Sequence, residues 1–227
     1  MFSDLISEII IMKLVLTGPK CSGKSLLGKK LADLLSVPFY ETDLMIEECF
    51  KAKNNSTLTC RSICSQYGED FFRDLEKNVI ISVAKLNNCI ISTGGSTMLN
   101  ANSRTLLREN SILILVTASL EILLKRLSAK EIPAFLNDKT ALDLFAARAC
   151  LVTEVVKPLA DITIDSSYLS SEETISCILK EVSNYMYLLR NAIAGKLRFI
   201  EACQAILKNS DNNQEADLNI LKLALEL

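Results

Sequence analysis

The chain of 227 residues contains no histidine, which excludes histidine-based acid–base catalysis and the common zinc sites that use histidine. It has no apolar run close to the roughly 18 residues that a membrane-spanning helix needs. Its net charge of -2 gives no electrostatic reason to expect nucleic acid or an anionic membrane as a partner. We therefore expect neither nucleic acid nor a membrane among its partners.

The eight cysteines form no pattern typical of disulfide or metal-binding proteins. None belongs to a Cys-x-x-Cys pair, and several lie in apolar runs such as Cys89–Ile91. A free cysteine in such a run behaves as a small buried hydrophobe, and free thiols are typical of a reducing compartment. Cytoplasmic localisation is therefore expected.

The N-terminal segment 1–12 is apolar but carries Asp4 and Glu8. It lacks a basic start and a small-residue cleavage site, so it is a poor match to a signal peptide. We interpret it as an N-terminal extension, with Met12 as an alternative start. Residues 13–184 are predicted to form one domain with a lid near 128–139, followed by a helical tail at 185–227.

Short apolar strands alternate with helical patterns from Lys13 to about Asn184. The strands are predicted at residues 13–17, 37–40, 89–92, 111–117 and 161–165. The helices are predicted at residues 25–36, 43–50, 68–86, 120–127 (capped by Ser119), 140–156, and onward from a cap at Ser170 or Ser171. Residues 51–59 and 128–138 are predicted as loops. This order predicts an α/β fold with a five-stranded parallel sheet covered by helices on both faces.

A glycine-rich segment, Gly18–Ser25, lies between the first predicted strand and the first predicted helix. It fits the pattern G-x-x-x-x-G-K-[ST], in which backbone amides and the helix N-terminus surround phosphate groups. The strand before it and the helix after it favour this P-loop over a chance glycine-rich turn. We predict that Lys24 reaches the β- and γ-phosphates of ATP and that the Ser25 hydroxyl binds Mg²⁺. The predicted ATP-binding residues of this segment are Gly18, Cys21, Ser22, Gly23, Lys24, Ser25 and Leu26.

Four further features follow in an order that resembles the shikimate kinase family. They are Phe39–Asp43, Gly68–Glu76, Thr93–Ser96, and Arg148 six residues before Glu154. The resemblance covers about residues 13–183. It implies a three-layer α/β/α fold like that of nucleoside monophosphate kinases. It also implies Mg²⁺-dependent transfer of the ATP γ-phosphate to shikimate, a step of chorismate and aromatic amino acid biosynthesis. We expect the protein to be a monomer.

The resemblance also implies roles for individual residues. Asp43 corresponds to the aspartate that binds the substrate hydroxyls and accepts a proton from one of them. Arg73 and Arg148 correspond to the arginines that hold the shikimate carboxylate, and Gly94 and Gly95 to a turn beside substrate and γ-phosphate. The chemistry agrees, because a planar guanidinium binds a carboxylate through two hydrogen bonds and a proton acceptor must lie within reach of the reacting hydroxyl.

Each of these residues also has a purely structural interpretation. Asp43 could cap a helix, and Arg73 could simply pair with Glu76 or Glu69 on one helix face. The two glycines could form an ordinary turn at a strand end. Arg148 could be a solvated surface charge.

The chain departs from the family pattern at several positions. Glu41 stands where the family has the first aspartate of a D-x-D pair, and its longer carboxylate is predicted to assist Mg²⁺ binding. Ser96 replaces a third glycine and would crowd the substrate if its φ were positive. Ile132 replaces the lid arginine that stabilises the transferring phosphoryl group, with Lys130 as a substitute cation. Arg126 falls near a position that lies against the adenine in similar kinases.

Two alternatives to shikimate kinase activity stay open. The first is a kinase of another small polyol or sugar acid, which the serine at the glycine turn would allow. The second is a catalytically weakened nucleotide-binding module, which Ile132 in the lid favours. The complete set of Lys24, Ser25, Asp43 and Arg73 argues against the second alternative.

Overall fold

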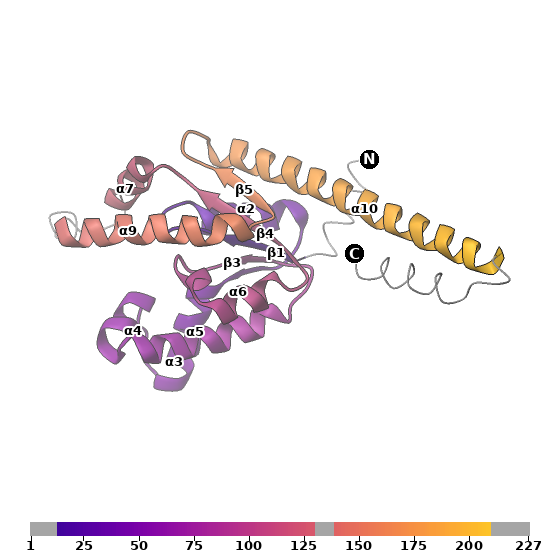
Figure 1. Cartoon of the computed structure of the whole chain (residues 1–227). Coiled ribbons are helices and arrows are strands. Elements are labelled where there is room, and N and C mark those ends of the chain that lie inside the picture. The colour runs from indigo at the N-terminus through magenta and orange to yellow at the C-terminus, as the bar shows by residue number, and fades with distance from the viewer. Residues whose placement is uncertain (1–12, 130–138, 210–227) are drawn as a thin grey trace. The chain divides into compact units, whose positions relative to one another are not determined.

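The computed structural model describes residues 13–129 and 139–209 (Figure 1). The chain divides into two compact units, Met1–Glu181 and Val182–Leu227. The first unit carries the sheet and every site residue that the sequence predicts. Residues 130–138, which carry Lys130 and Ile132 of the predicted lid, and the segments 1–12 and 210–227 lie outside the described residues.

Five parallel strands form one sheet in the order β2-β3-β1-β4-β5. Their bounds are β1 (Lys13–Thr17), β2 (Phe39–Glu41), β3 (Ile90–Ser92), β4 (Ser111–Thr117) and β5 (Ile162–Asp165). All five predicted strands are confirmed, β1 and β4 with the predicted bounds. The central strands β1 and β4 are almost continuously apolar because helices cover both of their faces.

Helices surround the sheet in two layers (Figure 1). They are α2 (Lys24–Leu35), α3 (Thr42–Asn54), α4 (Cys60–Tyr67), α5 (Glu69–Ala84), α6 (Ala101–Arg108), α7 (Leu120–Ser128), α9 (Lys139–Val156) and α10 (Ser171–Asn209), with short 3₁₀ turns η1 (Thr97–Leu99) and η2 (Lys157–Leu159). On one face, Val15 and Leu113 share a buried core with Val79 and Val83 of α5. The helix α2 covers the other face, and the predicted three-layer α/β/α fold is confirmed.

The helices α4 and α6 are absent from the sequence prediction. Each has eight residues and is held by a side-chain cap, since Thr59 accepts from the Ser62 amide and Asn100 from the Ser103 amide. A helix of two turns is too short to show a repeating apolar pattern. The helix α3 also exceeds its predicted end and continues to Asn54, into the predicted loop.

Two predicted helix caps are confirmed. The Ser119 hydroxyl accepts a hydrogen bond from the Ile122 amide at the start of α7. At the start of α10, the Ser170 hydroxyl accepts from the Glu173 amide at 3.2 Å, and the Glu173 carboxylate accepts from the Ser170 amide at 2.8 Å. This reciprocal pair is a capping box. Among the described helices, none combines the length and hydropathy that a membrane span requires.

Candidate active site

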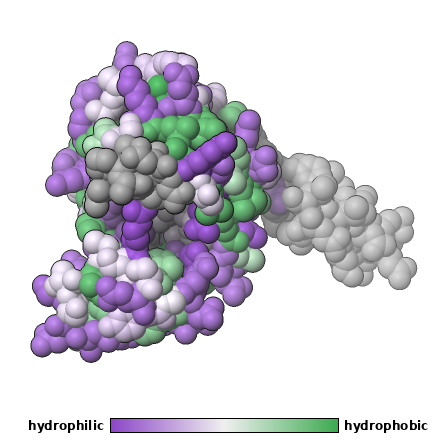
Figure 2. Space-filling view, turned by 90° about the vertical axis from the view of Figure 1, so that its left-hand side faces the viewer, coloured by the Kyte–Doolittle hydropathy of each residue, from purple (hydrophilic) through white to green (hydrophobic). Residues whose placement is uncertain are grey.

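A cavity of about 390 Å³ lies over the P-loop, where β1, β3 and β5 end. Ligands of open α/β sheets bind at this carboxyl edge. Figure 2 looks onto this edge and shows a hollow with hydrophilic residues around it. The cavity is lined by Lys20, Cys21, Ser22, Gly23, Lys24, Ser25, Leu26, Leu27, Asp43, Thr93, Gly95, Arg126, Ser166, Leu169, Ser171 and Thr174.

The P-loop has the backbone geometry of a phosphate cradle. Gly18, Cys21 and Gly23 have φ values of 139°, 69° and 100°. Alternation of such left-handed residues with ordinary ones turns successive amides toward a common point, where an anion binds. No side chain caps the N-terminus of α2, and an uncapped helix start attracts phosphate through its amides and dipole. The loop therefore presents mainly backbone groups to its ligand.

The packing around Gly18 explains why this position is glycine. A Cβ atom there would lie 2.0 Å from the backbone carbonyl oxygen of Val116 in β4. The P-loop is thus pressed against the neighbouring strand, and only a residue without a side chain fits. Although Gly18 does not line the cavity, it fixes where the loop begins.

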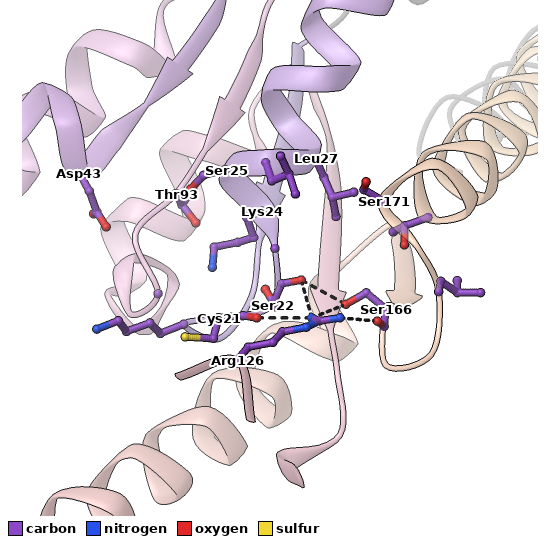
Figure 3. A pocket seen from close by; sticks show the side chains of 16 residues that line it. Cys21, Ser22, Lys24, Ser25, Leu27, Asp43, Thr93, Arg126, Ser166 and Ser171 are labelled. Carbon is purple, nitrogen blue, oxygen red and sulfur yellow. Dashed lines mark hydrogen bonds between the residues drawn. The ribbon is translucent and has the colours of Figure 1, made fainter. Parts of the chain in front are cut away.

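Lys24 and Asp43 approach the same part of the cavity from α2 and α3 (Figure 3). The buried Lys24 ammonium donates to the Pro19 carbonyl oxygen at 2.9 Å. Burial raises the pKa of the Asp43 carboxyl; the Lys24 charge opposes this increase, whereas nearby carboxylates, Glu41 first, add to it. A carboxylate with a raised pKa is a stronger base than an ordinary one. Asp43 is therefore suited to accept a proton beside a phosphate-binding lysine.

The N-terminus of α4 holds the helix turn that carries Asp43. The Cys60 thiol donates to the Asp43 carbonyl oxygen at 3.3 Å, and the Cys60 amide donates to Glu47 at 2.9 Å. Burial and the nearby carboxylates raise the pKa of this thiol, so it stays protonated and keeps its donor. The sequence pattern does not reveal this contact, because Cys60 directly follows the predicted loop 51–59.

Ser25 and Glu41 form a pair at the edge of the cavity. The Ser25 hydroxyl donates to the Glu41 carboxylate at the end of β2. The Thr93 hydroxyl lines the same cavity and has no hydrogen-bond partner among the described residues. Mg²⁺ is commonly bound by a hydroxyl, one or two carboxylates, water and substrate phosphates. These oxygen atoms are suitable Mg²⁺ ligands, and a site of this kind needs no larger acidic cluster. The described residues contain no group of three or more acidic, histidine or cysteine side chains that could hold a metal ion.

Arg126 of α7 joins the P-loop to the segment after β5 (Figure 3). Its guanidinium donates to the carbonyl oxygens of Cys21 and Ser22, each at 3.4 Å. It also donates to the Ser166 carbonyl oxygen at 2.7 Å and to the Ser166 hydroxyl at 3.1 Å. Arg126 lines the cavity and clamps two backbone segments, and its contact with ATP stays a prediction.

The glycine turn follows β3 and packs against the first turn of α3. The Gly94 amide donates to the Thr42 hydroxyl at 2.9 Å. A Cβ at Gly94 would lie 2.5 Å from a carboxylate oxygen of Asp43. Gly95 lines the cavity, and a Cβ there would lie 3.1 Å from the Lys20 amide nitrogen of the P-loop. Ser96 has a φ of -122°, so its backbone is not in the positive-φ region that would have made a serine crowd the substrate. A serine therefore fits at this position without strain.

Arg73 lies on α5 outside the residues that line the cavity. Its guanidinium donates to Glu76 at 2.7 Å and to Glu69 at 3.0 Å, and it lies 5.5 Å from the centre of the Phe72 ring. Burial lowers the pKa of Arg73, but the hydrogen bonds and charges of Glu76 and Glu69 outweigh it and raise that pKa. The structural interpretation of Arg73 predicted that it pairs with Glu76 or Glu69 on one helix face, and both contacts are confirmed.

Arg148 is exposed on α9 and is not among the residues that line the cavity. The structure thus brings the P-loop, Asp43, Gly95 and Arg126 together, but places neither Arg73 nor Arg148 among the residues that line the cavity. Several lining residues are missing from the sequence prediction. Thr93 and Ser166 directly follow predicted strands. Their place at the carboxyl edge of the sheet could therefore have identified them as residues of the binding site. Leu169, Ser171 and Thr174 offer no comparable signal in the sequence.

The site combines a P-loop, a hydroxyl–carboxylate pair that could hold Mg²⁺, and a carboxylate of raised pKa close enough to feel the lysine charge. This combination is typical of the class of P-loop phosphotransferases. Comparison with known proteins narrows this class. The sequence model of the family described as shikimate kinase matches residues 20–183. The chain belongs to the shikimate kinase family.

Individual relatives agree with this assignment. The chain is 34% identical over 168 residues to the shikimate kinase of Thermoanaerobacter pseudethanolicus, with 74% of this chain and 94% of the relative covered. It is 32% identical over 189 residues to that of Bartonella quintana, with 81% and 84% covered. The solved shikimate kinase of Aquifex aeolicus matches with a TM-score of 0.61 at 26% identity, covering 75% of this chain and 96% of that one.

The solved shikimate kinase of Acinetobacter baumannii, in complex with shikimate, matches with a TM-score of 0.64. It is 22% identical and covers 82% of this chain and 98% of its own. At that identity the match shows the shared fold alone. The fold and the family assignment therefore rest on independent comparisons.

Proposed function

We propose that this chain transfers the γ-phosphoryl group of ATP to a hydroxyl of shikimate. The product, shikimate 3-phosphate, belongs to chorismate and aromatic amino acid biosynthesis. The observation that carries the proposal is the cavity shared by Asp43 and the P-loop Lys24, in a member of the shikimate kinase family. The relative from Acinetobacter baumannii was solved with shikimate bound.

On the nucleotide side, ATP occupies the P-loop between Gly18 and Leu26, and Arg126 supports the loop. Lys24 moves from the Pro19 carbonyl oxygen to the β- and γ-phosphates. Ser25 and Glu41 hold Mg²⁺, whose charge neutralises phosphate oxygens when it is bound. These residues position the triphosphate so that its γ-phosphorus faces the acceptor.

On the acceptor side, Asp43 accepts the proton of the reacting hydroxyl. The acceptor oxygen forms a bond to the γ-phosphorus while the bond to the bridging oxygen of ADP breaks. Arg73 binds the shikimate carboxylate with its fork of N–H donors. Arg148 is the second arginine proposed to bind the same carboxylate. Gly94 and Gly95 let the substrate and the γ-phosphate approach the turn closely.

A coupled assay of ADP release tests this proposal. Release should depend on both shikimate and Mg²⁺, and it should fall at least about a hundredfold in Lys24→Ala and Asp43→Asn. Arg73→Lys should raise the KM for shikimate by about tenfold or more and leave the KM for ATP nearly unchanged, because lysine cannot form the bidentate contact. Shikimate binding without turnover would indicate the weakened module instead. Turnover of another sugar acid or polyol, but not shikimate, would indicate a different acceptor.

We also propose a cytoplasmic monomer whose catalytic domain spans residues 13–184. The free cysteines among the described residues support a reducing compartment. Size-exclusion chromatography with light scattering would test the monomer. A chain ending at Asn184 should keep its shikimate-dependent activity if the tail is separate, and loss of folding would contradict that boundary.

A further inference from the structure

A buried hydrogen-bonded chain connects the glycine turn to Arg73. Thr97, the first residue of η1, is fully buried, and its hydroxyl donates to Oε1 of Glu76 at 2.7 Å. The other oxygen of that carboxylate, Oε2, accepts from Nη1 of Arg73 at 2.7 Å. Glu76 is only 4% exposed. Thus each carboxylate oxygen of Glu76 has one defined protein donor.

Thr97 also touches the turn that supports Asp43. A Cβ placed on Gly94 would lie 2.9 Å from the Thr97 hydroxyl and 2.5 Å from the Asp43 carboxylate. The Thr97 amide donates to the Gly94 carbonyl oxygen at 3.3 Å. The hydroxyl therefore lies between the backbone of the glycine turn and the carboxylate that holds Arg73.

The energetics of buried carboxylates make this contact important. A buried charged oxygen without a donor is costly, so Glu76 keeps its rotamer only while both donors are present. The second carboxylate on Arg73, Glu69, is largely exposed and holds the guanidinium weakly. The orientation of Arg73 consequently depends on Glu76, and the orientation of Glu76 depends on Thr97.

We propose that Thr97 is a positioning residue for the acceptor. Its hydroxyl fixes Glu76, and Glu76 fixes the Arg73 guanidinium in the orientation that binds a carboxylate of the substrate. This inference rests on the proposed function, because it takes Arg73 as the group that binds the shikimate carboxylate. It adds a residue of the η1 turn to the determinants of acceptor affinity.

The test uses Thr97→Val, which keeps the shape and removes the hydroxyl, and Thr97→Ser, which keeps the hydroxyl. Thr97→Val should raise the KM for shikimate about tenfold, as expected for one buried acceptor left without a donor. The KM for ATP and kcat should change less than about threefold. Thr97→Ser should restore the KM for shikimate. Thr105→Val is the matched control, since Thr105 is an exposed threonine on α6 that donates only to its own helix.

A double-variant cycle shows whether Thr97 acts through Glu76. Glu76→Gln should raise the KM for shikimate more than Thr97→Val, since it removes the charge that holds Arg73. The double variant should resemble Glu76→Gln alone, because the hydroxyl has no further path to the substrate. Additive effects, or an equal rise in the KM for ATP, would overturn the proposal in favour of a general packing role.

A spectroscopic measurement separates this proposal from the proposed function. The Nε–Hε NMR signal of Arg73, assigned by its loss in Arg73→Lys, should shift in Thr97→Val and return in Thr97→Ser without any substrate. If the wild-type protein neither binds nor phosphorylates shikimate, the proposed function fails. The Arg73 signal still shows whether Thr97 controls the orientation of Arg73. An Arg73 signal that is identical in Thr97→Val and wild type would overturn the link itself.

Discussion

The two sides of the cavity are built in different ways. The nucleotide side consists mainly of backbone, with left-handed residues in the P-loop, a bare helix start and carbonyl oxygens clamped by Arg126. The proposed acceptor side consists of side chains: Asp43 of α3 lines the cavity, and the network of Arg73, Glu76 and Thr97 from α5 and η1 lies outside the lining residues. Backbone geometry fails abruptly when a Cβ atom intrudes, whereas a side-chain network loses function one contact at a time.

Gly18→Ala should cause the largest loss, because it breaks the backbone side. The added Cβ would lie 2.0 Å from a carbonyl oxygen of β4 and would require a φ of 139°. Backbone atoms cannot rotate away, so we expect a loss of at least about 3 kcal/mol in the free energy of unfolding. Thermal unfolding and ATP binding measure this effect.

The control for that variant is Gly68→Ala. Gly68 also has a positive φ, 89°, but a Cβ there meets no atom within 4 Å. Only backbone strain remains, because φ 89° with ψ 164° is a conformation that residues with a Cβ rarely adopt, and it costs about 1–3 kcal/mol. Equal destabilisation by the two variants would show that φ, rather than the contact with β4, requires glycine at position 18.

Gly94→Ala should break the acceptor side while the fold survives. Its Cβ would meet the Asp43 carboxylate at 2.5 Å, and that side chain can rotate away from its proposed catalytic position. Misplacement of a reacting group by about 1 Å costs about a hundredfold, so kcat should fall by that factor with little change in the KM for ATP.

Gly95→Ala is the variant to compare with Gly94→Ala, because it alters the neighbouring glycine on the side of the P-loop. Its Cβ would press on the backbone of Lys20 in the P-loop, so its effect should appear in the KM for ATP. If both variants changed the same kinetic constant, the separation of the cavity into two sides would be wrong.

Asp43→Asn should reduce kcat and stabilise the fold. The folded state raises the pKa of Asp43, so between the unfolded and folded pKa values the folded protein holds a proton that the unfolded chain has released. The free energy of unfolding therefore falls as pH rises through this window, and the penalty persists at neutral pH. Asparagine carries no charge and removes the penalty, so its melting temperature at pH 7 should exceed that of wild type.

In the wild type, kcat should fall as pH decreases through this raised pKa, since only the carboxylate accepts a proton. Melting curves between pH 4 and pH 8 and a pH profile of kcat measure both effects. The control is Asp33→Asn, which changes an exposed carboxylate on α2. A melting temperature of Asp43→Asn below that of wild type at pH 7 would contradict the burial argument.

The contrast between the two sides also explains what the sequence reveals. The nucleotide side is contiguous, so Gly18–Ser25 and the strand and helix around it predict its position and geometry. The acceptor side is assembled from distant segments, and no local pattern links Thr97 to Glu76 across 21 positions. Arg148 illustrates the same limit, since a matching place in the chain order did not bring it to the cavity.

Glu69→Gln should have the smallest effect and the opposite sign. Glu69 accepts from Nη2 of Arg73 at 3.0 Å, on a largely exposed side chain, so it competes with a substrate carboxylate for the same donor. Exposed ion pairs are weak, so removing this charge should lower the KM for shikimate by about two- to threefold. Asp70→Asn is the matched control, because it removes the other acidic charge from the first turn of α5. A higher KM in Glu69→Gln, with Asp70→Asn unchanged, would mean that Glu69 orients Arg73 as Glu76 does. The competition for Arg73 would then be absent, and both carboxylates would belong to the side-chain network that defines the acceptor side.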